Sequence, residues 1–192
     1  SVKREAFEAG ITSDTAADKS ISRFRHPMYV HRTQEWIGDC FDRVADQLDE
    51  TIETAYDGGG PVAAVIFNSA ARSNGFQQYL AEHRPDLASK ITKDNGYDTN
   101  AGRSIPATTA GVNTTSKGEV GLNYDLKRLV MAAPHTASQF IQRIGRAARQ
   151  SPAVINLYGL KDPNWPVEQS YPQFLARVAD TAAFASITHQ RE

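Results

Sequence analysis

The sequence predicts an α/β domain built around a mainly parallel sheet. Short apolar runs of strand length occupy residues 62–67, 127–133 and 153–158, and such runs are typical of strands buried on both faces. Between and around them, residues 34–56 and 136–149 carry apolar side chains at helical spacing. Strand-like and helix-like segments that alternate in this way are typical of βα units.

The first predicted helix spans residues 34–56 and has one apolar and one acidic face. Its apolar stripe consists of Trp36, Ile37, Phe41, Val44, Leu48, Ile52 and Ala55. Acidic residues fall mostly on the other side, which predicts a solvated acidic face. The Asp49-Glu50 pair lies within this helix, so we interpret it as surface and not as a magnesium site. The glycines and proline at 58–61 end the helix.

The remaining segments complete a single domain. Asn68 or Ser69 can cap a helix that continues to about residue 83. Residues 84–118 are predicted to form a loop with one strand near 106–112. Residues 1–33 lack clear periodicity and are predicted to be irregular, whereas 34–192 form the domain. Within it, 160–192 are expected to form a C-terminal loop and a helix over about 171–188.

Composition excludes several classes of protein. The 192 residues hold 21 Lys and Arg against 22 Asp and Glu, which excludes a polycation but leaves room for a local nucleic-acid site. One Cys excludes a disulfide framework or a Cys-rich zinc site and suits a reducing compartment. The five His residues have no metal-ligand spacing, and no apolar run approaches the ~20 residues of a membrane helix. We therefore expect a cytoplasmic protein without a metal site or a membrane partner.

The segment 142–149 concentrates arginine residues. On the helix predicted from about Thr136 to Arg149, Gln142, Arg146 and Arg149 lie on one side and Arg143 points between the faces. The opposite, core side would hold Phe140, Ile141, Ile144, Ala147 and Ala148. Two interpretations remain open: a site for a phosphate-like anion, which guanidinium groups bind in pairs, or a solvated basic face. Gly145 inside a helix predicts the close approach of another backbone or a ligand.

Three segments resemble motifs of superfamily 2 helicases. The pattern Gln142-x-x-Gly145-Arg146-x-x-Arg149 resembles motif VI. Residues 115–123 resemble motif V, with Asn123 where Asp is usual, and 64–69 resemble motif IV. The resemblance covers about residues 60–160 and is greatest to the helicase component of CRISPR interference effectors. It implies the second, C-terminal RecA-like domain, a three-layer fold with helices on both faces of the sheet.

The resemblance also implies roles for individual residues. Arg146 and Arg149 would be the catalytic arginine fingers that act on ATP. Residues lining the nucleotide cleft would be Gln142, Gly145, Glu119, Gly121 and Asn123. Single-stranded DNA or RNA would contact Ser69, Arg72, Thr115 and Ser116. For Ser69, a helix cap and a phosphate contact both remain open, and Trp36 and Trp165 could stack on bases or simply be buried.

The sequence has no Gly-x-x-x-x-Gly-Lys-Ser/Thr phosphate loop. By resemblance, that loop belongs to the first RecA-like domain, which would hold most of the ATP and Mg²⁺. We therefore expect an inactive half of an ATP-dependent helicase, whose partners are that first domain and, as a candidate, a CRISPR effector complex. The alternative is a non-catalytic module that binds nucleic acid or protein and retains the helicase fold.

Overall fold

A seven-stranded sheet forms the centre of the protein. The structure, a computed structural model, describes residues 26–94, 106, 108–115, 124–160 and 168–170. The strand order is β3-β4-β2-β5-β6-β1-β7. In chain order the strands are β1 Met28–Thr33, β2 Ala63–Phe67, β3 Ile91–Asp94, β4 Gly111–Thr115, β5 Arg128–Ala132, β6 Ala153–Tyr158 and β7 Glu168–Ser170. Strands β1 to β6 run parallel, and β7 pairs antiparallel with β1.

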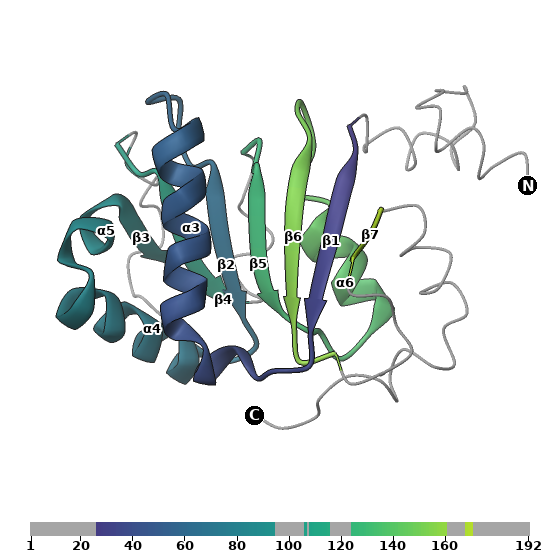
Figure 1. Ribbon diagram of the computed structural model, residues 1–192, viewed down its shortest axis with the longest axis horizontal. Coiled ribbons are helices and arrows are strands. Elements are labelled where there is room, and N and C mark those ends of the chain that lie inside the picture. The colour runs from purple at the N-terminus through teal and green to yellow at the C-terminus, as the bar shows by residue number, and fades with distance from the viewer. Residues whose placement is uncertain (1–25, 95–105, 107, 116–123, 161–167, 171–192) are drawn as a thin grey trace, which may run out of the picture.

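Helices cover both faces of this sheet. The helices α3 (Phe41–Ala55), α4 (Ala70–His83) and α5 (Pro85–Lys90) lie on the front face, and α6 (Ala137–Ile144) lies behind it (Figure 1). A short 3-10 helix, η1 (Ile37–Asp39), leads into α3. The predicted α/β fold with a mainly parallel sheet and helices on both faces is thus confirmed. None of the helices in the described part of the chain is long and apolar enough to cross a bilayer.

The central strand β2 separates two apolar cores. All of its residues are buried, and successive side chains point to opposite faces. Ala64 and Ile66 belong to the core under α6, whereas Val65 and Phe67 belong to the core under α3 and α4. A strand buried on both faces needs the unbroken apolar run that the sequence shows at this place.

Several expected elements are corrected by the structure. Residues 28–33, predicted as irregular, form β1, whose Met28 and Val30 are fully buried. The region 84–118 contains α5 and β3, and its strand β4 lies later than the expected 106–112. The loop expected after residue 158 includes β7. The predicted helix over 171–188 and residues 1–25 lie outside the described residues.

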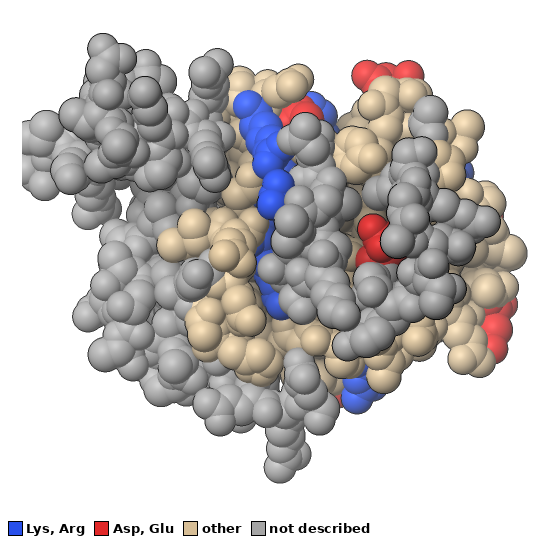
Figure 2. Space-filling model, turned by 180° about the vertical axis from the view of Figure 1, so that it is seen from behind, with Lys and Arg blue, Asp and Glu red and all other residues tan. Residues whose placement is uncertain are grey.

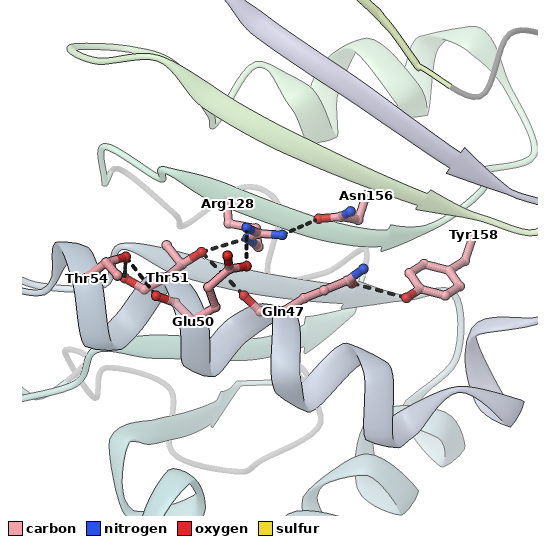
Figure 3. A network of polar contacts seen from close by, with 7 residues as sticks. All are labelled: Gln47, Glu50, Thr51, Thr54, Arg128, Asn156 and Tyr158. Carbon is pink, nitrogen blue, oxygen red and sulfur yellow. Dashed lines mark hydrogen bonds and ion pairs between the residues drawn. The ribbon is translucent and has the colours of Figure 1, made fainter.

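The acidic face of α3 does not simply face solvent. Arg84 donates to Asp46 (2.7 Å) and Asp49 (2.6 Å), and Lys90 pairs with Glu53. Figure 3 shows that Arg128 of β5 reaches Glu50 and Thr51 on this helix. These contacts hold α3 against the sheet. The Asp49-Glu50 pair, which the sequence predicted to be surface, is thus used for structure, and the Asp49 side chain is only 22% exposed.

A buried amide joins β4 to α4. Asn113 is fully buried, donates to the carbonyl of Ser73 (2.8 Å) and accepts from the Ser73 hydroxyl (2.9 Å). Its amide also donates to Gln77 (3.2 Å). Because a buried polar group without a partner is costly, this network fixes α4 on β4.

We expect Asn113→Ala to lower the free energy of unfolding by about 2–3 kcal/mol, since it leaves Ser73 buried without its partner. Urea denaturation measures this change. The control is Gln78→Ala, on the exposed side of α4, which should change the free energy of unfolding by less than ~0.5 kcal/mol. Equal losses in both variants would contradict the role assigned to Asn113.

Candidate functional site

The carboxyl ends of β2, β4 and β5 meet at one edge of the sheet. Phe67, the last residue of β2, pairs with Thr115, the last residue of β4. Asn68 and Ser69 follow directly, and the Ser69 hydroxyl accepts from the backbone N–H of Arg72 (3.3 Å), so Ser69 caps α4. In open parallel sheets this edge is where ligands bind. The structure therefore brings Ser69, Arg72 and Thr115 to one edge, although the Thr115 side chain is only 3% exposed.

Helix α6 is shorter than predicted. It ends at Ile144, and Gly145 caps it with an N–H that bonds the Ile141 and Arg143 carbonyls. A Cβ at Gly145 would lie 3.0 Å from the Ile141 oxygen. The nearest backbone at Gly145 thus belongs to the preceding turn of its own helix, so the expected approach of another backbone is not present among the described residues.

The residues after Gly145 follow a different path from a helix. Ala147 forms a parallel bridge with Leu126, which precedes β5, and Ala148 has a positive φ of 52°. The expected helical face of Gln142, Arg146 and Arg149 is therefore wrong, because only Gln142 lies on the helix. Ala147 and Ala148 are buried as expected, whereas Ile141 is 46% exposed instead of facing the core.

Both candidate arginine fingers lie in this non-helical segment. Arg146 and Arg149 are half-buried, and Arg149 Nε donates to the Gly145 carbonyl (3.3 Å). Viewed from behind, a stripe of Lys and Arg atoms runs down the face of the molecule that α6 covers (Figure 2). Lys and Arg side chains on this face have a chemistry suited to phosphate oxygens.

Arg143, which the sequence placed between two faces, is a buried clamp. It is 1% exposed, and its Nη1 donates to Asn68 Oδ1 (2.7 Å) and to the Ala132 carbonyl (3.0 Å). Asn68 in turn donates to the Ala133 carbonyl (3.0 Å). One guanidinium group thus links the arginine segment to the ends of β2 and β5. The available signal was its place in the sequence between the core residues Phe140 and Ile144.

A second anchor fixes the far end of the arginine segment. Asp125 accepts from Lys127 (2.6 Å), from the Gln150 N–H (2.8 Å) and from the Ser151 hydroxyl (2.8 Å). Burial alone would raise the pKa of Asp125, but these hydrogen bonds outweigh it and hold the pKa below its ordinary value. The segment is therefore held at Arg143 on one side and at Asp125 on the other.

One small pocket of the described chain lies apart from the candidate site residues. A pocket of about 100 Å³ opens beside α3 at the ends of β1 and β6, lined in part by Arg43, Gln47 and Tyr158, and none of the candidate site residues lines it. It is too small to enclose a nucleotide. The described residues contain no group of three His, Cys, Asp or Glu able to hold a metal. Glu119, Gly121, Asn123 and Ser116 lie outside the described residues.

Two solved helicase structures are similar to this chain. The DUF1998 helicase MrfA bound to DNA shares 16% identity at a TM-score of 0.50, and the match covers 85% of this chain and 22% of MrfA. T. fusca Cas3-ADP shares 16% identity at a TM-score of 0.50, over 82% of this chain and 21% of Cas3. The fold is that of a RecA-like helicase domain.

This RecA-like chain spans about a fifth of the length of either helicase. No protein-family model matches its sequence, and no curated protein does. The similarity confirms the predicted resemblance to a helicase domain at the level of the fold. The roles of individual residues and the division at residue 34 stay predictions.

Arg143→Ala should lower the free energy of unfolding by about 2–4 kcal/mol, because Asn68 and the Ala132 carbonyl lose a buried charged donor. Chemical denaturation measures the loss. Gln142→Ala, an exposed neighbour on the same helix, is the matched control and should stay within ~0.5 kcal/mol of the parent chain. A clamp is ruled out if Arg143→Ala is as stable as that control.

Asp125→Asn should destabilise the protein in a pH-dependent way. Because the folded protein lowers the pKa of Asp125, the carboxylate adds stability above the ordinary Asp pKa of about 3.9, and this stability is lost as the pH falls through the folded pKa. We expect a deficit of about 1 kcal/mol at pH 7 that starts to shrink at about pH 4 and disappears once the pH is below the folded pKa of Asp125. Urea unfolding at a series of pH values measures it, and a deficit that is the same at every pH would contradict this role.

Proposed function

We propose that this chain is the second RecA-like domain of an ATP-dependent superfamily 2 helicase or translocase. The observation that carries the proposal is the arrangement of Gln142, Gly145, Arg146 and Arg149. This motif VI pattern falls at the end of α6 and in the clamped segment that follows it. It does so on a sheet with the fold of a helicase domain, so that pattern and fold support the same assignment independently.

Arg146 and Arg149 would act as arginine fingers. Phosphoryl transfer from ATP develops negative charge on the phosphate oxygens, and preorganised guanidinium groups stabilise that charge. Preorganisation is supported by the two anchors, Arg143 and Asp125, that hold the segment in place. Gln142 and Gly145 would line the same cleft, together with Glu119, Gly121 and Asn123 of motif V.

The remaining parts of the nucleotide site would come from the first RecA-like domain. The described residues offer cations for phosphate but no acidic cluster for a divalent ion, and the sequence has no phosphate loop. These donors fit the outer phosphate of ATP and do not fit Mg²⁺. ATP and Mg²⁺ would therefore be held mainly by the partner domain, and the chain alone would not turn over ATP.

A single strand of nucleic acid would follow the carboxyl edge of the sheet. Ser69 and Arg72 stand at the start of α4, and Thr115 ends β4. The motif V resemblance adds Ser116 to these contacts. Hydroxyl groups, helix N-terminal amides and a guanidinium group bind phosphates without regard to base sequence. That property suits a motor that moves along any strand of DNA or RNA.

The wider assembly is also part of the proposal. Similarity in fold to Cas3 and the motif resemblance support a CRISPR effector complex as partner and the cytoplasm as compartment. Co-purification of this chain with the effector complex tests their interaction.

Arg149→Ala in the assembled helicase, meaning this chain together with its first RecA-like domain, tests the proposal. We expect ATP turnover to fall by about 10³-fold or more, the usual effect of losing an arginine finger, while strand binding is unchanged. Steady-state ATPase assays and fluorescence anisotropy measure the two quantities.

Arg43→Ala is the control, because Arg43 is an exposed arginine of α3 paired with Glu35, and it should keep full turnover. An Arg149→Ala variant with undiminished ATPase activity would contradict the role of Arg149 as an arginine finger. An assembled protein that binds strands but has no ATPase at all would instead be a binding module that retains the helicase fold.

A further inference from the structure

The segment before α3 places an indole ring at the carboxyl edge of the sheet. Trp36 immediately precedes η1, and the neighbouring Ile37 and Cys40 are 1% and 5% exposed. Both pack in the same apolar core as Phe67 and Phe76. Trp36 itself is half-buried. The buried Ile37 and Cys40 therefore anchor this turn, and they hold the Trp36 indole at the edge of the apolar core.

Trp36 forms a pair with Arg72 of α4. The guanidinium carbon lies 5.8 Å from the centroid of the Trp36 ring, within cation–π range. Gly38 lies against both groups, because a Cβ there would come within 2.7 Å of the indole Nε1 and 2.9 Å of Arg72 Nη1. Only a glycine at this position leaves room for the ring and the guanidinium group as they stand.

This pair adjoins the proposed strand track. The backbone N–H of Arg72 bonds the Ser69 hydroxyl, so Arg72 belongs to the first turn of α4, where β2 ends. Glu35, the nearest acidic residue before Trp36 in the sequence, is already paired with Arg43. An aromatic ring and a cation thus stand beside a helix N-terminus at the edge where a strand would pass.

We propose that Trp36 and Arg72 form a stacking platform for one nucleotide of a single strand, an inference that rests on the proposed function. The indole stacks on a base, and Arg72 binds the adjoining phosphate. Aromatic stacking tolerates every base because each has a π-face, so the platform adds affinity without sequence preference. It also extends the track from β2 and β4 to the turn before α3.

The experiment uses the full chain, which contains two tryptophans. In a Trp165→Phe variant, Trp36 is the only tryptophan, and we expect oligothymidylate to quench its fluorescence. A Trp36→Phe variant, which keeps Trp165, is the matched control and should show no comparable quenching. An abasic oligonucleotide, which offers the same phosphates without bases, should bind without quenching.

Affinities separate stacking from charge. Trp36→Ala should weaken oligothymidylate binding by about 5- to 150-fold, the range for loss of one stacked base, and leave abasic binding unchanged. Trp36→Phe should lose less, which guards against misfolding of the alanine variant. Arg72→Ala should lower the slope of log affinity against log salt by about 0.7, the contribution of one phosphate in a single strand.

Each outcome bears on a separate claim. Oligothymidylate binding with no quenching and no loss in Trp36→Ala overturns the platform and leaves the proposed track in place. No binding of any oligonucleotide, even at low salt, overturns both the track and the platform. Quenching by the abasic strand equal to that by oligothymidylate overturns base stacking.

Discussion

A buried hydrogen-bonded charge holds the candidate site together. Arg143 places its guanidinium group between Asn68 and the Ala132 carbonyl, and burial of a charge is tolerated only when such partners are present. Through this contact α6 is tied to the end of β2, where α4 and its Ser69 cap begin. The arginine segment and the strand edge are therefore joined by the hydrogen bonds of one buried side chain.

Much of the architecture could be predicted because buried strands and helix faces have recognisable patterns of apolar residues. The runs that became β2, β5 and β6 are apolar because these strands are covered on both faces. The stripe on α3 and the cap at Ser69 were likewise visible as periodicity and as a local hydrogen-bonding residue. The motif pattern around Arg146 also predicted the fold of a helicase domain, and the similarity in fold agrees with it.

What could not be predicted depends on tertiary contacts. Strand β1 alternates between buried and more exposed residues. It is held by pairing with β6 and β7, which lie far along the chain. Helical spacing predicted a helix that continues to Arg149. The helix instead ends before this segment, where Ala147 forms a bridge with Leu126. Ile141 is exposed although its spacing placed it on the core side. The role of Arg143 was missed because its place between Phe140 and Ile144 indicates burial but does not show which polar groups it would meet.

The central claim is that Arg146 and Arg149 reach the outer phosphate of ATP from this domain. A structure of the assembled helicase with ADP and a planar phosphate mimic tests it most directly, because such a mimic marks the position of the transferred group. The account predicts that both guanidinium groups lie within hydrogen-bonding distance of the mimic, with Arg143 still bonded to Asn68. A bound nucleotide with both guanidinium groups turned away from it would contradict the account.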